Sequence, residues 1–347
     1  MNVTPRRAVP KIVCLLAASL SAAVPVLSQP TSRALFSSDA DTLGSRYRYP
    51  DTAAAELTGA VVTLLPGDST GWHRHAVPTV GYVLAGQLTV EYATGQVRVF
   101  GSGDGILEAQ DVAHNGHNHG SEPVRLVVFS AGAAGVPGSE PADPPRPDDF
   151  VALQSAVPGL EIELRYFGRE NFLGRPVAGY EANVVYLTRV AATALGSVQE
   201  ALGTEGLGLK VFDGYRPQRA VDDFTRWAAA PGDTATKAAY YPNVEKSLLV
   251  QTGYIAERSG HSRGSTIDLT LIELASGEEV DMGSPYDFFD PISWPSSPAI
   301  AEAARANRMK LRAVMLRHGF QPLDQEWWHF TLRDEPYPDT YFDFPVR

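Results

Sequence analysis

The sequence has little cysteine, and it has no long apolar run beyond its first 28 residues. Cys14 is the one cysteine among 347 residues, and it lies inside the N-terminal apolar run. If that run is removed, no thiol is left and the fold must be stable without disulfides. Basic residues are also in deficit, since 29 Lys and Arg face 40 Asp and Glu, for a formal net charge of −11. This acidic balance argues against nucleic acid or an anionic membrane as a partner.

Residues 1–28 have the layout of a secretory signal peptide. Arg6, Arg7 and Lys11 precede an apolar run over residues 12–27, which ends in small residues suited to cleavage. The run has about 16 residues and contains a proline, so it is short for a membrane span. We therefore expect a periplasmic or secreted protein whose mature form has no membrane span. An uncleaved membrane anchor is the alternative.

The rest of the chain divides into two domains by composition. Residues 29–48 are polar and irregular and are interpreted as a tether. Residues 49–132 hold short β-type runs separated by glycine turns, which is typical of a small antiparallel barrel. Five prolines among residues 133–149 predict an extended linker. Residues 150–347 mix helical and strand periodicities, so an α+β domain is expected.

The predicted barrel carries a histidine cluster. In the segment Gly67-Asp-Ser-Thr-Gly-Trp-His73-Arg-His75 two histidines are one residue apart, so on a strand both side chains point to the same face. His114 follows in the segment from Gly103 to Asn118. The two segments resemble the first and second motifs of the cupin family. This resemblance implies a β-barrel whose interior histidines can bind a metal ion.

Three positions depart from the cupin pattern. Ala109 and Asp111 stand for a proline and a glycine, and Thr79 stands for the glutamate that supplies a fourth metal ligand in the family. A hydroxyl is a poor substitute for a carboxylate, but three imidazoles are a workable site for zinc or iron. Three interpretations stay open: a second metal ion with oxygenase or isomerase chemistry, a ligand sensor, and histidines that only form hydrogen bonds inside the barrel. His117 and His119 flank the second motif and are not expected to be ligands.

Two short segments near the C-terminus offer another set of ligands. They are Ser259-Gly-His261-Ser-Arg-Gly-Ser-Thr-Ile-Asp268 and Glu326-Trp-Trp-His329. His261, Asp268 and His329 suit a catalytic zinc ion, because three protein ligands leave a fourth position open for water. Glu326 lies close to His329 in the sequence and is the candidate general base. The pattern predicts metal-assisted hydrolysis.

Five blocks in the second half resemble, in the same order, the D-alanyl-D-alanine dipeptidases of the vancomycin-resistance type. The blocks are Leu164–Gly174, Asp213–Pro217, Ser259–Asp268, Asp281–Phe289 and Glu326–His329. The similarity covers nearly the whole second half, and five blocks in family order are far more specific than any one of them. It implies a zinc D,D-peptidase domain with one catalytic zinc ion.

Four further residues are candidates for the substrate pocket. Arg216, a fixed cation, is the candidate for stabilising the tetrahedral oxyanion, and a structural salt bridge to Asp213 is the alternative. The resemblance implies that Asp287 binds the free ammonium group of the substrate and that Ser259 and Tyr166 line the pocket. A buried carboxylate that faces a free amine would favour a dipeptide over an internal peptide bond.

The combined features predict zinc-dependent hydrolysis of D-alanyl-D-alanine or a related D,D-dipeptide in cell-wall metabolism. Dipeptidases of this type are typically cytoplasmic, so an exported enzyme leaves a second hypothesis open, a D,D- or L,D-carboxypeptidase on peptidoglycan fragments. A third hypothesis is a cupin-centred metal oxygenase or ligand sensor. The expected partner is a small dipeptide or cell-wall fragment, and a homodimer formed through the cupin domain is left open.

Overall fold

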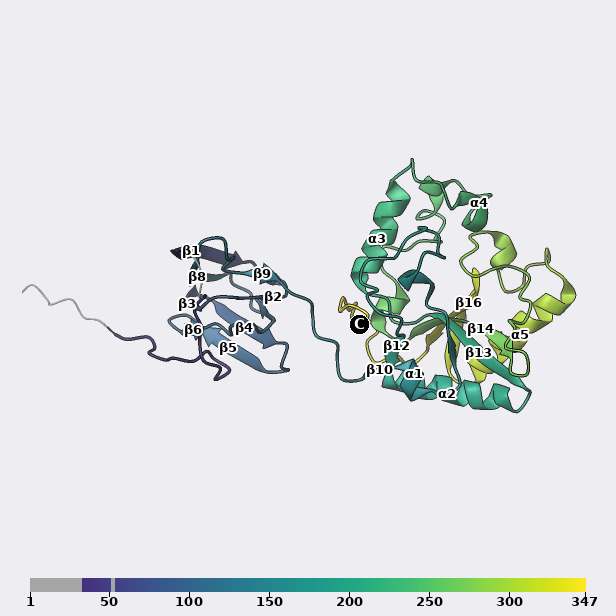
Figure 1. Ribbon diagram of the computed structural model, residues 1–347, viewed down its shortest axis with the longest axis horizontal. Coiled ribbons are helices and arrows are strands. Elements are labelled where there is room, and N and C mark those ends of the chain that lie inside the picture. The colour runs from purple at the N-terminus through teal and green to yellow at the C-terminus, as the bar shows by residue number, and fades with distance from the viewer. Residues whose placement is uncertain (1–32, 51–53) are drawn as a thin grey trace, which may run out of the picture. The chain divides into compact units, whose positions relative to one another are not determined.

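The computed structural model describes residues 33–50 and 54–347 (Figure 1). The predicted signal peptide, with Cys14, lies outside the described residues. Within them, no helix has the length and apolar character needed to cross a membrane. The predicted fold class is confirmed, since a β-barrel is followed by an α+β domain.

Two antiparallel sheets form the barrel. The first has the order β1-β8-β3-β6 and the second the order β5-β4-β7-β2-β9. In β4 buried and more exposed residues alternate, as expected of a strand with one face toward a core. The bounds of the strands are β1 Ala55–Leu64, β2 His73–Arg74, β3 Thr79–Ala85, β4 Gln87–Tyr92, β5 Val97–Gly101, β6 Gly105–Leu107, β7 His114–His117, β8 Val124–Ala133 and β9 Glu140–Pro141.

The segments that precede and follow the barrel in the sequence both contact it. In the range predicted as a linker, β9 pairs with β2, so that Pro141 faces His73. In the range predicted as a tether, the Tyr47 hydroxyl donates to the carbonyl of Glu108 at 3.0 Å. These contacts use backbone groups, which composition does not reveal. The predicted domain boundaries themselves stay predictions.

A mixed five-stranded sheet lies at the centre of the second domain, with the order β11-β13-β14-β16-β15. The helices α2 and α5 pack against each other, α2 contacts β13, and α5 contacts β15 and β16 (Figure 1). A small sheet pairs β10 with β12. The strands are β10 Phe150–Ala152, β11 Glu161–Ile162, β12 Tyr186–Thr188, β13 Leu207–Asp213, β14 Thr266–Glu273, β15 Phe320–Leu323 and β16 Glu326–Leu332; the helices are α1 Leu153–Ala156, α2 Arg189–Gly203, α3 Gln218–Ala229, α4 Lys237–Tyr240 and α5 Glu302–Arg317.

The long C-terminal helix α5 is shorter than its sequence pattern suggests. The sequence pattern predicts a helix over residues 297–318, but the helix begins at Glu302. Pro298 disfavours a helical conformation at Ser297, and the Ser297 hydroxyl accepts a hydrogen bond from the backbone of Ala299 at 3.4 Å.

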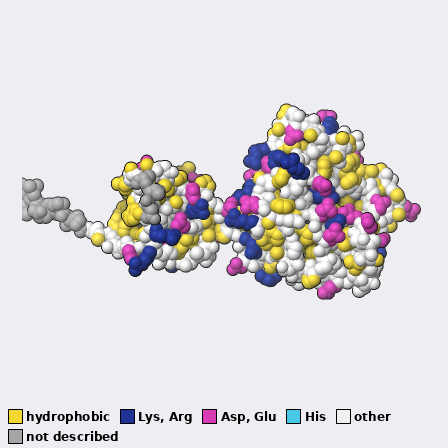
Figure 2. Space-filling model, in the orientation of Figure 1, with side chains coloured by type: hydrophobic (Ala, Val, Ile, Leu, Met, Phe, Trp, Pro, Cys, Tyr) yellow, Lys and Arg dark blue, Asp and Glu magenta, His cyan; other side chains and the backbone are white. Residues whose placement is uncertain are grey.

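On the face of the second domain visible in Figure 2, basic and acidic side chains are interspersed.

Candidate active site and metal centres

Two neighbouring strands place two of the predicted zinc ligands side by side. Asp268 on β14 and His329 on β16 are direct partners in the antiparallel ladder, so both side chains leave the same face of the sheet. His261 comes from the short 3-10 helix η3, Gly260–Arg263, which precedes β14. The structure therefore brings the three predicted ligands together in a cluster that can hold a metal ion.

The spacing of the three ligand atoms fits zinc. Nε2 of His261 lies 3.3 Å from Oδ1 of Asp268, Nδ1 of His329 lies 3.1 Å from the same oxygen, and the two nitrogens are 3.2 Å apart. Neighbouring ligands of a tetrahedral zinc ion with bonds of about 2.0 to 2.1 Å are about 3.3 Å apart. Oδ1 of Asp268 is also buried without a hydrogen-bond partner, which fits an atom that binds a metal ion.

The electrostatics of the cluster stabilise positive charge. Burial would raise the pKa of Asp268, but His261 and His329 hold that pKa well below its usual range, so the carboxylate is charged. Burial opposes a charge on His329, yet Asp268 raises its pKa. Burial lowers the pKa of His261, whose Nδ1–H donates to the carbonyl of Gly214 at 2.7 Å. That hydrogen bond leaves Nε2 of His261 free to bind a metal ion.

Close packing around Gly214 explains the glycine of the Asp213–Pro217 block. A Cβ atom at this position would lie 2.5 Å from Cγ1 of Val185 and 2.8 Å from the carbonyl oxygen of Tyr186. A larger residue would displace the backbone whose carbonyl orients His261.

Glu326 begins β16 and reaches the edge of the zinc cluster. Its Oε2 lies 3.6 Å from Nδ1 of His329, and its side chain is 15% exposed. Burial raises the pKa of Glu326 to about 7. Residues three apart on a regular strand point to opposite faces, but the ladder is irregular between Pro322 and Leu323, and Leu323 faces Glu326. Such irregularities re-aim side chains.

Arg216 is held between two carboxylates. Its Nε and Nη2 each lie 2.9 Å from Oδ2 of Asp213, and Nη2 lies 3.6 Å from Oδ2 of Asp268. The guanidinium also lies 5.1 Å from the ring centres of Tyr166 and Phe224. The structural salt bridge to Asp213 is therefore present, and it orients a buried cation beside the zinc cluster.

The predicted ammonium-binding residue, Asp287, belongs to a chain of buried polar groups. The Tyr166 hydroxyl donates to Oδ2 of Asp287 at 2.9 Å, and the Tyr286 hydroxyl lies 3.1 Å from that of Tyr166. Tyr286 also donates to Oδ2 of Asp268 at 3.1 Å. Burial, reinforced by the nearby Asp268, raises the pKa of Asp287 well above its usual range, so the carboxyl group keeps its proton until a cation pairs with it. Sequence reasoning missed Tyr286, although it lies beside Asp287 in the same block.

One small cavity is lined by every residue predicted for this site, and its volume is about 250 Å³. Ligand clefts commonly measure about 300 to 1,000 Å³, so this cavity suits a small substrate. Ser259 lines it and also accepts a hydrogen bond from the backbone of His261 at 3.3 Å, which caps η3. The residues are Tyr166, Arg216, Ser259, His261, Asp268, Asp287, Glu326 and His329.

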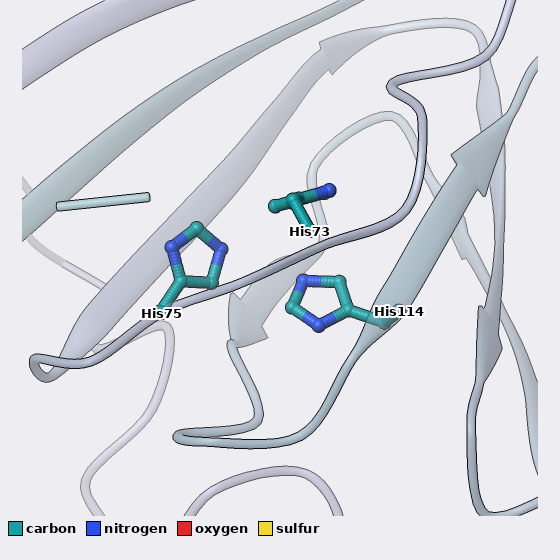
Figure 3. A group of neighbouring side chains, drawn as sticks. All are labelled: His73, His75 and His114. Carbon is teal, nitrogen blue, oxygen red and sulfur yellow. The ribbon is translucent and has the colours of Figure 1, made fainter. Parts of the chain in front are cut away.

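The predicted histidine cluster of the barrel also assembles. His73, His75 and His114 direct their rings toward a shared region (Figure 3), with ring centres 4.4 to 5.1 Å apart. The Nδ1 atoms lie 2.9, 2.7 and 2.8 Å from the carbonyl oxygens of residues 71, 138 and 112, respectively. Each Nδ1 therefore carries its proton toward the backbone, and each Nε2 is free for a metal ion. The cluster lines a cavity of about 750 Å³.

Glu108 is a further residue of this cavity that sequence reasoning missed. Its Oε2 lies 3.4 Å from Nε2 of His114, and burial raises the pKa of Glu108 to about 7. The signal that could have found it is the missing carboxylate at Thr79, which invites a search of the neighbouring strand. His117 and His119 stack on each other with ring centres 5.3 Å apart and are not part of the cluster.

The two domains match known families. The fold and the site of the second domain define a metallopeptidase, and a family described as D-ala-D-ala dipeptidase matches residues 146–347. The chain belongs to this zinc-dependent family. A cupin domain family matches residues 60–130, so the first domain is a cupin.

Curated relatives named D-alanyl-D-alanine dipeptidase align with the second domain. The protein of Streptomyces coelicolor is 48% identical over 198 residues, and that of Enterococcus faecium is 46% identical over the same length; each alignment covers 57% of this chain and 98% of the relative. The Escherichia coli protein is 34% identical over 184 residues, which cover 53% of this chain and 84% of the relative.

Proposed function

We propose that the second domain hydrolyses D-alanyl-D-alanine, or a closely related D,D-dipeptide, in a zinc-dependent reaction. Membership of the D-ala-D-ala dipeptidase family supports this activity. The observation that carries it is the small cavity in which Glu326 and Asp287 converge with the three zinc ligands. Zinc bound by His261, Asp268 and His329 would polarise the scissile carbonyl and lower the pKa of the attacking water.

Asp287 would bind the free ammonium group of the dipeptide. The carboxylate is buried, and its partner Tyr166 holds Oδ2 at 2.9 Å. An ammonium group that pairs with it satisfies a charge that burial otherwise makes costly. A substrate whose amine is acylated offers no such charge, so this contact selects free dipeptides.

Glu326 would move the proton of the reaction. It would take a proton from the attacking water as the oxygen joins the carbonyl carbon, and return it to the leaving amine when the C–N bond breaks. The pKa of about 7 that burial gives this carboxyl group suits both steps near neutral pH. The products are two molecules of D-alanine.

Arg216 would stabilise the oxyanion that develops on the substrate carbonyl. Its guanidinium is fixed by Asp213 and by the rings of Tyr166 and Phe224. A cation held in place before the reaction needs no reorganisation when charge develops. The salt bridge to Asp213 and the catalytic role are therefore compatible.

Three substrates test the dipeptidase against the carboxypeptidase alternative. The zinc-loaded protein is assayed with D-alanyl-D-alanine, with its N-acetylated form, and with a muropeptide that ends in D-alanyl-D-alanine. We expect D-alanine to be released efficiently from the free dipeptide alone. A preference for the muropeptide would instead favour a D,D-carboxypeptidase and would contradict the role of Asp287.

We also propose that the protein is exported to the periplasm or secreted, on the basis of the basic and apolar pattern of residues 1–28. The N-terminal sequence of the protein purified from its native host tests this proposal. A mature chain that begins shortly after residue 28 would support it. An intact Met1 in a protein of the cytoplasmic fraction would contradict it.

A second candidate function lies in the cupin domain. The convergence of three Nε2 atoms favours metal binding by His73, His75 and His114. A metal oxygenase and a ligand sensor both fit such a site in a cavity with apolar walls. Two measurements distinguish the oxygenase from the sensor: metal content and oxygen consumption. Both are made on the protein with an intact barrel and on a His114→Ala variant. Iron with oxygen consumption would favour the oxygenase, and bound metal without turnover would favour the sensor.

A further inference from the structure

We propose that Glu108 supplies the fourth ligand of the metal site in the cupin barrel, in place of the glutamate that the cupin motif has at the position of Thr79. The inference rests on the proposed three-histidine site. A histidine variant tests the three-histidine site, and variants of Glu108 test the fourth ligand. Either hypothesis can therefore fail without the other.

Glu108 and Thr79 are neighbours across a β-ladder. The backbone N–H of Glu108 donates to the carbonyl of Thr79 at 3.1 Å, which continues the register in which Val80 faces Leu107. Residues that face each other in an antiparallel ladder project to the same side of the sheet, with Cβ atoms about 5 Å apart. A carboxylate on residue 108 therefore enters the barrel beside the place from which the family's glutamate would reach the metal.

Thr79 is engaged elsewhere. It is fully buried, its Oγ1 lies 2.9 Å from Oγ of Ser130, and it donates to the carbonyl of Val77 at 3.1 Å. Glu108 lines the cavity that contains the three histidines, and Thr79 is not among the lining residues. Both side chains leave the same side of the sheet, but the Thr79 hydroxyl bonds to Ser130 on β8 below the cavity wall, whereas the longer Glu108 side chain reaches the cavity.

Buried polar atoms without partners surround the site. Nε2 of His75, Nε2 of His114 and Oε2 of Glu108 have no hydrogen-bond partner. Since each Nδ1 is bonded to a backbone carbonyl, the facing Nε2 atoms carry lone pairs and have no proton to donate to Glu108. Buried acceptors that face one another are costly unless a proton or a metal ion lies between them.

The distance from Glu108 to His114 and the charges of the site suit a divalent metal. Oε2 of Glu108 lies 3.4 Å from Nε2 of His114, close to the separation of about 3.3 Å between neighbouring ligands of a tetrahedral ion. Three neutral imidazoles and one carboxylate form a mixed nitrogen and oxygen site for zinc, cobalt, iron or manganese. The carboxylate would offset half of the charge of such an ion in a cavity whose walls are mostly apolar.

Cobalt binding to the full-length protein tests the proposal. The parent protein carries His261→Ala and His329→Ala, so that the peptidase cluster does not contribute, and it is titrated with Co²⁺ alone by calorimetry and visible absorption. Three variants are made in this background: Glu108→Gln, His114→Ala and Glu91→Gln. Glu91 is the control, because its Oε2 lies 3.8 Å from Nε2 of His117 in the same barrel, and His117 does not belong to the histidine cluster.

We expect Glu108→Gln to weaken Co²⁺ binding at least about ten-fold, since even groups that only orient metal ligands contribute about 10- to 100-fold. Glu91→Gln should bind like the parent, and His114→Ala should lose the site. Without metal, Glu108→Gln should be as stable as the parent or more so, because it removes an unpaired buried carboxylate.

Parental affinity in Glu108→Gln would overturn the role of Glu108, while loss of binding in His114→Ala would still support the three-histidine site. Equal losses in Glu108→Gln and Glu91→Gln would also overturn it, because the effect would then be one of net charge. If Glu108→Gln does not fold, Glu108→Asp serves the same comparison, because a side chain shorter by one methylene withdraws the carboxylate. Parental affinity in that variant would again overturn the proposal.

Discussion

The hydroxyl of Tyr286 donates a hydrogen bond of 3.1 Å to Oδ2 of Asp268, the carboxylate whose other oxygen faces His261 and His329. One oxygen is thus fixed by the protein, and the second is left for the metal. Groups that orient a metal ligand in this way tune its affinity. We therefore expect Tyr286 to orient a ligand of the predicted zinc site without being a ligand itself.

Replacement of this tyrosine should weaken zinc binding. We expect Tyr286→Phe to lose about 10- to 100-fold in zinc affinity, measured by competition with a chromogenic chelator, and about 1 kcal/mol in the free energy of unfolding. Tyr215→Phe is the control, because it removes another buried hydrogen bond of 2.9 Å, to the carbonyl of Phe344. Equal zinc affinities in the two variants would contradict the role of Tyr286.

The Glu326→Gln variant should lose turnover and keep its zinc. Gln cannot accept the proton of the attacking water, so kcat should fall by about 10² to 10⁴. Zinc content measured by mass spectrometry should equal that of the unmodified protein, because Glu326 is not among the three ligands. Near-normal kcat would exclude Glu326 as the base, and loss of zinc would instead make it a ligand.

The Asp287→Asn variant should lose its preference for a free amine. A buried charge pair contributes about 2 kcal/mol or more, so kcat/KM for D-alanyl-D-alanine should fall roughly 30-fold or more. The rate with the N-acetylated dipeptide should change much less, since it has no ammonium group. The ratio of the two kcat/KM values is the measurement. An unchanged ratio would show that the ammonium group binds elsewhere.

Arg308 on α5 stabilises the loop that carries Tyr286 and Asp287. It is 1% exposed and donates to the carbonyls of Met282, Ile292 and Trp294 at 2.6 to 2.8 Å. Lysine lacks the planar fork of guanidinium donors, so Arg308→Lys leaves buried acceptors unpaired and should cost about 3 kcal/mol or more in unfolding free energy.

Urea unfolding measures the loss in Arg308→Lys, and KM for the dipeptide should rise as well. Arg317→Lys on the exposed face of the same helix is the control and should change neither quantity. A rise in KM without any loss of stability would mean that Arg308 acts on the pocket rather than on the loop.

Short motifs made the cluster of His261, Asp268 and His329 predictable from the sequence. His261 and Asp268 lie in one block, and His329 lies in another together with Glu326. Only one long-range relationship, the approach of these two blocks, was therefore needed to propose the ligands. Among the short β-type runs of residues 49–132, the segment Gln87–Tyr92 forms β4, because its alternating hydrophobic residues determine its buried face. Local patterns of this kind depend on side chains that the sequence states directly.

The relationships that sequence analysis missed depend on the register between strands. Glu108 reaches the histidine cluster because its backbone pairs with that of Thr79, and no spacing along the chain encodes that pairing. Strands of two residues, such as β2 and β9, offer no periodicity to detect. Their bounds follow from backbone hydrogen bonds, which form only when the barrel closes.

The pairing of β9 with β2 affects how the two domains can be separated for study. The carbonyl of Gly138 accepts the proton of Nδ1 of His75 at 2.7 Å, and Pro141 faces His73 in the ladder. The cupin family match ends at residue 130, so a barrel cut at that point would lack the strand and the carbonyl that orient two of its three histidines. If such an isolated barrel bound no metal, the truncation itself would explain the loss. A fragment that extends beyond residue 141 would keep both contacts.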